Sequence, residues 1–154
     1  KEYAMTTTYS SLEFFKKMTQ KSLTITTLDN KNTEYEGACF TSEETSYRSR
    51  LGKLTPKKKG YFIAMWEKDP KNNNQAYDVE TFPDYLSVVI LNGNKQGVFL
   101  FPKDVLLAKK ILRTNQQPGK MAFRLYPTWE TNLNPTATKT QAWQTTYFTD
   151  YSII

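Results

Sequence analysis

Positive side chains are concentrated in residues 47–60. This stretch contains no acid, and its six cations are Arg48, Arg50, Lys53, Lys57, Lys58 and Lys59. The formal net charge of the protein is +6, so the rest of the chain sums to zero. A local basic patch is typical of a protein that binds a polyanion, because cations neutralise phosphates and release counterions.

The two arginines favour phosphate binding more than the lysines do. Arg48 and Arg50 are two residues apart on a predicted strand, so their side chains share a face. Guanidinium groups suit bidentate phosphate contacts. For the lysine triplet alone, a solvated turn beside a core strand explains the residues equally well.

A second acid-free stretch runs from Val105 to Trp129. Its cations are Lys109, Lys110, Arg113, Lys120 and Arg124. Cations near a helix end are ordinary partners of the helix dipole, and this explains each of them singly. Two such stretches in a small protein nevertheless suit one groove.

The C-terminal third mixes cations, amides and rings. Amides and rings can read bases, although they also form ordinary cores with polar rims. Burial is the simpler expectation for Trp143. The candidate binding residues here are Arg124, Tyr126, Trp129, Lys139 and Gln141.

The composition excludes several kinds of active site. The absence of histidine removes Ser-His and Cys-His triads, and the lone Cys39 cannot form an internal disulfide or a multi-cysteine metal site. No glycine-rich phosphate loop is present. We expect no cofactor and no metal. We also expect a cytoplasmic protein, because no apolar run is long enough for a membrane span and no signal peptide is visible.

Local patterns predict a mixture of helices and strands. Ser10 and Glu13 have the spacing of a capping box. Asn92-Gly93 between two apolar runs predicts a hairpin that is buried on both faces. The predicted elements are a helix at 11–21, strands at 34–41, 46–52 and 60–68, a polar loop at 69–84, hairpin strands within 85–101, a helix at 103–113, a strand at 121–129 and a short helix from Pro135.

This order predicts an α/β (α+β) protein with a mixed β-sheet flanked by helices. We expect one domain over residues 1–154, in which residues 1–9 are a flexible or added N-terminal segment.

One acid and one lysine flank the predicted hairpin. Asp84 precedes its first strand and Lys103 follows its second, which resembles the PD-(D/E)XK nuclease pattern. There, two acids bind magnesium and the lysine orients or activates water. Phe101 stands where the second acid should be, and a phenyl ring cannot ligate magnesium. We therefore expect a degenerate site without catalytic residues, and a turn residue after proline is the simpler explanation of Asp84. The core order of that fold is helix, three strands, helix, strand, which segments 11–21, 60–68, 85–91, 96–101, 103–113 and 121–126 follow.

A resemblance to a known family runs through residues 34–148. It rests on "EYEGACF", "RSRLGKLTPKKKGYFIAMWEKD", "DYLSVVI", "FLFPKDVLLAKKIL", "GKMAFRLYPTWE" and "KTQAWQTTYF". Together these segments resemble the MepB family of small bacterial proteins, named after a product encoded beside a drug-efflux pump. The resemblance implies a PD-(D/E)XK-like fold, nucleic-acid binding and missing nuclease acids. The genetic context does not imply contact with drugs or membranes.

Three functions are weighed, and non-catalytic nucleic-acid binding ranks first. In that hypothesis the phosphates are held by Arg48, Arg50, Lys53, Lys57, Lys58 and Lys59, while Lys103, Arg124 and Lys139 line the former active-site groove. Unpaired strands or RNA are at least as favoured as duplex DNA. The second hypothesis is a magnesium-dependent nuclease that uses Asp84, Lys103 and a relocated acid. The third is a protein-interaction module whose basic face meets an acidic partner, such as a regulator of the efflux genes.

Overall fold

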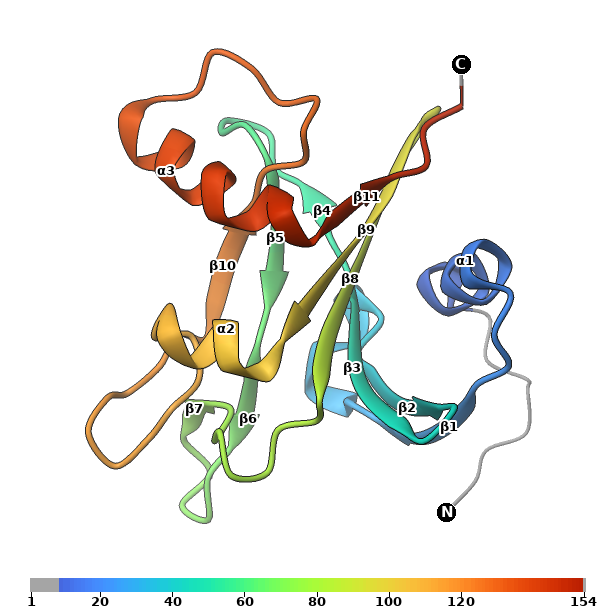
Figure 1. The fold of residues 1–154 in the computed structure, drawn as a ribbon. Coiled ribbons are helices and arrows are strands. Elements are labelled where there is room, and N and C mark those ends of the chain that lie inside the picture. The colour runs from blue at the N-terminus through green and yellow to red at the C-terminus, as the bar shows by residue number, and fades with distance from the viewer. Residues whose placement is uncertain (1–8, 154) are drawn as a thin grey trace.

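The structure is a computed structural model that describes residues 9–153, and Figure 1 shows its fold. Apart from Tyr9, the expected flexible or added segment at residues 1–9 lies outside the described residues. In chain order the elements are α1 (Ser10–Thr19), β1 (Thr24–Leu28), the 3-10 helix η1 (Asn30–Tyr35), β2 (Ala38–Ser42), β3 (Thr45–Leu51), β4 (Lys53–Leu54), β5 (Tyr61–Ala64), β6 (Trp66–Lys68), β7 (Asn74–Ala76), β8 (Tyr85–Asn92), β9 (Lys95–Pro102), α2 (Lys103–Ala108), β10 (Ala122–Leu125), α3 (Pro135–Gln144), the 3-10 helix η2 (Thr145–Tyr147) and β11 (Phe148–Asp150).

The larger sheet has six strands in the order β1-β2-β3-β8-β9-β11. β3 is parallel to β8 and the other neighbours are antiparallel, so the sheet is mixed as predicted. The predicted hairpin is confirmed, because β8 and β9 pair as far as Asn92 and Lys95. The two turn residues are Gly93 and Asn94, one position later than the predicted Asn92-Gly93, because Asn92 pairs with Lys95. Of these two residues only Gly93 has a positive φ, of 63°, a conformation that glycine adopts without strain. Residues 86–90 are all buried, as expected for a strand covered on both faces.

The strand β11 at the edge of this sheet was not predicted. It pairs antiparallel with β9, opposite Gly97–Phe99. A side chain at Gly97 would overlap the ring of Phe148, so the glycine makes room for β11 to approach. Three residues are too short for an alternation pattern to indicate a strand, and tertiary pairing decides the outcome.

A smaller sheet has the order β10-β5-β4, with antiparallel pairing throughout. The single strand predicted at residues 60–68 is wrong, since Ala64 and Met65 are both buried and break the alternation. The chain then continues as β6, which pairs with β7 instead. The nuclease-like element order implied that β5 and β10 join the sheet of the hairpin. They form a separate sheet instead.

Helix α1 starts one residue earlier than predicted and without the expected capping box. Its N-cap residue is Tyr9, which makes no side-chain cap bond. The carboxylate of Glu36 accepts instead, from Ser11 N at 2.8 Å, Ser11 Oγ at 2.6 Å and Ser10 Oγ at 3.0 Å. A carboxylate at a helix N-terminus is stabilised by the helix dipole. The cap thus comes from a residue remote in sequence.

Helix α2 is shorter than the predicted helix at 103–113. It ends at Ala108, and Lys110 takes a left-handed φ of 62° that turns the chain inward. Ile111 then enters the core. Arg113 is not helical and pairs with Asp78 and Glu67, at 3.2 and 3.4 Å.

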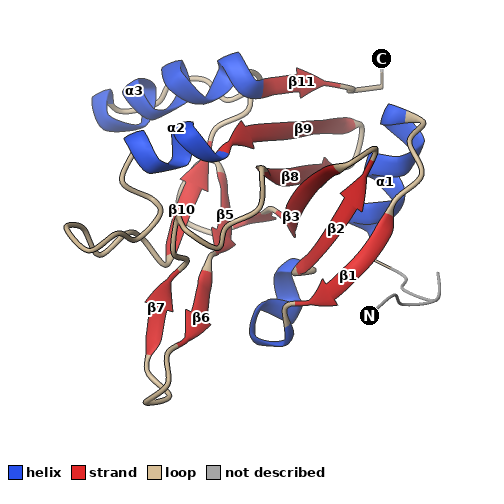
Figure 2. Cartoon of the chain, turned by 60° about the horizontal axis from the view of Figure 1, so that its bottom comes forward, coloured by secondary structure: helices blue, strands red, loops and turns tan. Residues whose placement is uncertain are grey.

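The main core lies between the two sheets. Tyr61 and Ile63 of β5 pack in one cluster with Phe99 and Phe101 of β9. α1 covers another part of the larger sheet, where Phe14 packs with Val89 and Val98. α2 and α3 lie together on the far side of the molecule from α1, as Figures 1 and 2 show. In residues 9–153 no helix is long and apolar enough to cross a membrane.

Candidate nucleic-acid interface

The two arginines predicted to hold phosphates lie inside the protein. Arg50 is fully buried, and its Nη1 is 2.7 Å from Asp29 Oδ2. Arg48 Nε donates to the same oxygen at 3.0 Å, and its guanidinium lies 3.9 Å from the centroid of the Tyr77 ring. They share a face as predicted, because both reach Asp29. The predicted phosphate contact is wrong for Arg50, since none of its surface is accessible.

These arginines have a structural role. Burial opposes the ionisation of Asp29, but the charges of Arg50 and Arg48 and their hydrogen bonds lower its pKa below the ordinary value. Arg50 also donates to Ala64 O at 2.9 Å and to Tyr77 Oη at 2.8 Å. The cluster therefore links β3 to β5 and to the segment before η1, and Arg48 keeps only 14% of its side chain exposed.

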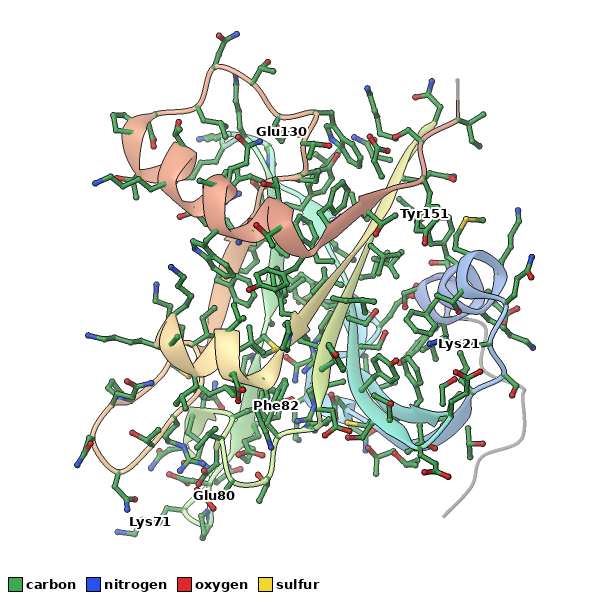
Figure 3. The ribbon with its side chains drawn as sticks, viewed as in Figure 1. Lys21, Lys71, Glu80, Phe82, Glu130 and Tyr151 are labelled. Atoms are coloured by element: carbon green, nitrogen blue, oxygen red, sulfur yellow. The ribbon has the colours of Figure 1, made fainter. Side chains whose placement is uncertain are left out.

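The lysine triplet lies at a hollow beside α3. This hollow, of about 430 Å³, is lined by Lys57, Lys58, Lys59, Arg124, Tyr126 and by residues 132–134, 136 and 137. The three lysines are exposed. Lys59 Nζ donates to Thr131 O at 2.6 Å, so one lysine also holds the loop that leads into α3. Figure 3 shows this loop at Glu130, at the top of the molecule.

A second hollow of about 240 Å³ adjoins the first, because Arg124 and Tyr126 line both. Lys109 and Lys120 supply its other cations, and Trp143 supplies a ring. We call the two hollows together the basic groove; its cations are Lys57, Lys58, Lys59, Lys109, Lys120 and Arg124. Among the described residues no Asp or Glu lines it. The two acid-free stretches thus meet at one surface, as the sequence predicts.

Gln144 fixes the wall of the groove. It is fully buried, and its Oε1 accepts from Tyr126 N while its Nε2 donates to Arg124 O, both at 2.9 Å. These bonds attach the end of α3 to the end of β10. They set the backbone positions of the two residues that both hollows share.

Gly60 sets the place of the Tyr126 ring. Its φ is 86°, and a Cβ there would lie 2.8 Å from the ring and 2.8 Å from Leu125 O. Only glycine allows both the left-handed backbone and this close approach. The glycine that follows the lysine triplet therefore also shapes the groove.

The other predicted binding residues lie outside the groove lining. Lys53 and Lys139 are exposed. Gln141 Nε2 donates to Pro127 O at 2.9 Å and Glu130 O at 3.0 Å, so its amide nitrogen supports the loop. Trp129 packs on Phe148, and its Nε1 donates to Tyr61 Oη at 3.3 Å. Trp129 is therefore partly buried against the main core.

The predicted degenerate nuclease positions are split. Asp84 and Lys103 line one hollow of about 360 Å³ at the open end of the β8–β9 hairpin, together with Asp104. Phe101 is fully buried and stacks on Phe99 at 5.4 Å. Backbone and side-chain hydrogen bonds from Ser46 lower the pKa of Asp84. The expectation that Lys103 shares a groove with Arg124 and Lys139 is wrong, because Lys103 lines this separate hollow.

Comparison with known proteins identifies the family. A model of the MepB-like family matches residues 29–150, which is most of the chain. The chain belongs to the MepB-like family. The MepB protein of one crystal structure is 41% identical in sequence to this chain, and the two structures superpose with a TM-score of 0.84. The match covers 95% of this chain and 99% of that one. No curated protein matches the chain. All residues of the basic groove fall within the matched range.

Two features of the groove were only partly predicted from the sequence. Lys109 and Lys120 belong to the second acid-free stretch, but they were not among the candidate binding residues, and both line the groove. Their shared freedom from acidic neighbours was the available signal. Gln144 carried no signal of its own, because the bonds of a buried amide depend on segments that meet only in the folded chain.

Proposed function

We propose that this MepB-like protein binds nucleic acid along the basic groove. One observation carries the proposal: six cations line two adjoining hollows, and no acid within residues 9–153 lines them. A buried or ion-paired cation could not bind a phosphate, but the five lysines are exposed and form no ion pair with a carboxylate of these residues. A phosphate chain is the ligand whose charge is complementary along such a length.

We further propose that the fold is related to that of PD-(D/E)XK nucleases and that the nuclease activity has been lost. The shared hollow of Asp84, Lys103 and Asp104 favours it, while the separate sheet of β5 and β10 does not. Residual magnesium-dependent cleavage is the alternative that this hollow supports. Intact labelled strands after incubation with magnesium would remove that alternative, and cleavage that is lost in Asp84→Ala would establish it.

Binding is tested with a pair of neutral substitutions in the groove. We expect Lys57→Gln/Lys58→Gln to weaken binding of labelled strands and to reduce the slope of log K against log salt by about 1.4 for single strands. Fluorescence anisotropy across a salt series measures both quantities. The wild-type affinity itself is expected to fall as salt rises.

Lys16→Gln/Lys17→Gln is the matched control. These lysines are adjacent and exposed on α1, across the molecule from α3 (Figure 1). The control variant should bind as wild type does. Equal effects of the two pairs would show only a general charge effect. Salt-independent binding, or none at low salt, would contradict the proposal and leave the groove to an acidic protein partner.

A further inference from the structure

The outer face of the smaller sheet carries a row of complementary side chains. In the strand register Lys53 lies opposite Phe62, and Phe62 lies opposite Arg124. Directly opposed residues of antiparallel strands project from the same face. The neighbouring pair on this face is Ala64 and Ala122, so the rings and charges are concentrated in one row.

A second ring extends the row. Tyr35, at the end of η1, has its ring centroid 6.2 Å from that of Phe62. Lys53 Nζ lies 5.8 Å from the Tyr35 centroid, and the Arg124 guanidinium lies 5.5 Å from the Phe62 centroid. Both rings are partly exposed. Each ring therefore has a cation beside its face, and each nucleotide brings a base for a ring and a phosphate for a cation.

This row is continuous with the basic groove, because Arg124 belongs to both. Arg124 Nη1 donates to Thr55 Oγ1 at 2.8 Å, which holds the loop between β4 and the lysine triplet against β10. A strand whose phosphates follow the groove can thus pass Arg124 onto the sheet face without leaving the positive surface.

We propose that Tyr35 and Phe62 form a base-stacking platform, and that the ligand of the groove is single-stranded nucleic acid. This inference rests on the proposed function. Successive bases in a duplex strand are about 3.4 Å apart, whereas the two ring centroids are 6.2 Å apart. A base on each ring requires a strand that has left the duplex stack. Bases are accessible to rings in this way only when they are unpaired.

The alternative assignment of the rings is structural. Partly exposed rings on a sheet face can simply shield the strands beneath them. That assignment explains the contact between Tyr35 and Phe62 but gives no reason for a cation beside each ring or for continuity with an acid-free groove. The two assignments differ in what a leucine substitution does to binding.

The test uses the full chain and labelled single strands of about 12 nucleotides, in RNA and DNA, with matched duplexes. Tyr35→Leu and Phe62→Leu remove the rings and keep apolar bulk, whereas Tyr35→Phe and Phe62→Tyr keep the rings. Tyr151→Leu is the control, because Tyr151 is a partly exposed ring that packs on Phe14 of α1, outside the groove and the row. Circular dichroism verifies that each variant is folded. A 2-aminopurine base in the strand reports stacking through quenching of its fluorescence.

We expect the two leucine variants to bind single strands roughly five- to a hundredfold more weakly, with the salt slope unchanged. The ring-keeping variants and Tyr151→Leu should retain wild-type affinity and quenching. Salt-sensitive wild-type binding that the leucine variants leave intact would overturn the platform alone, as would tighter binding of duplex than of single strands. Absence of salt-sensitive binding by the wild type would overturn the proposed function as well.

Discussion

Asp29 forms ion pairs with two arginines that are largely or completely buried, Arg48 and Arg50. Its side chain is 11% exposed, and Arg50 is completely buried. We predict that Asp29→Asn lowers the free energy of unfolding by about 3–5 kcal/mol, because Arg50 then loses its counter-charge inside the protein. Urea unfolding measures the change. Asp78→Asn is the control: its partner Arg113 is partly exposed, so a loss within about 1 kcal/mol is expected. Equal losses would contradict the argument.

The same residue predicts a pH dependence of stability. The pKa of Asp29 is lowered in the folded state, so the unfolded state binds its proton more tightly. The stability that Asp29 contributes is therefore present above its unfolded pKa of about 3.8 and is lost as the pH falls through the lower folded value. The difference in unfolding free energy between wild type and Asp29→Asn should shrink over that acid range. A difference that stays constant below pH 3.8 would contradict the assignment.

Residue types alone did not show which cations are buried and which line the groove. The spacing of Arg48 and Arg50 predicted a shared face, which is confirmed, but not what that face meets. Their partner Asp29 lies 19 and 21 residues away in the chain, in a segment with no pattern that points to it. The lysine triplet, which had an equally good explanation as a plain solvated turn, is the part that lines the groove. Burial of a charge depends on a distant partner, and a single sequence does not show one.

At the scale of elements, the groove depends on how α3 meets β10. The Gln144 side chain forms hydrogen bonds with Arg124 O in β10 and with Tyr126 N just after it. Because the side chain has no accessible surface, water cannot replace it as the partner of these two backbone groups. We predict that Gln144→Leu costs about 2–4 kcal/mol of unfolding free energy, because two backbone groups lose their partners. It should also weaken nucleic-acid binding by displacing Arg124 and Tyr126.

Gln144→Glu refines that prediction. A neutral carboxyl group can accept from Tyr126 N and donate to Arg124 O, whereas an ionised carboxylate is costly to bury and faces a carbonyl oxygen. A smaller loss than in the leucine variant is therefore expected at acid pH. Thermal unfolding and anisotropy on the same samples check both effects. If both variants were as stable as wild type and bound equally well, Gln144 would not position the groove.

Elements with strong local signals were predicted well and the others were not. The β8–β9 hairpin was found because a glycine between two apolar runs is a local signal, although the turn consists of Gly93 and Asn94 and not of Asn92 and Gly93. The division of residues 60–68 was missed because it follows from burial on a second sheet. Helix α1 was found from its apolar spacing, but its cap is Glu36, which no local rule could supply. The family resemblance is confirmed, whereas the pairing implied by the nuclease-like order is not.

For the whole molecule, a charge asymmetry follows from the fold. α1 lies on one side of the larger sheet, while α3 and β10 lie on the other (Figures 1 and 2). The lysine triplet lines a hollow together with residues of α3. Six cations line the groove, and no Asp or Glu of the described residues lines it with them. Such a local concentration of positive charge suits capture of a polyanion and a strong dependence of the association rate on salt.

Ligand binding should accordingly stabilise the entire fold. A ligand that binds only the native state at a concentration of 100 times its Kd adds about 2.7 kcal/mol to the free energy of unfolding. For a protein of this size the midpoint of thermal unfolding should rise by roughly 5–10 °C. Differential scanning fluorimetry with a single strand at low salt measures the rise, which should vanish at high salt as binding is lost. Lys57→Gln/Lys58→Gln should show a smaller rise at the same strand concentration, and Lys16→Gln/Lys17→Gln the full one. A rise that persists at high salt and in the groove variant would place the ligand elsewhere on the molecule.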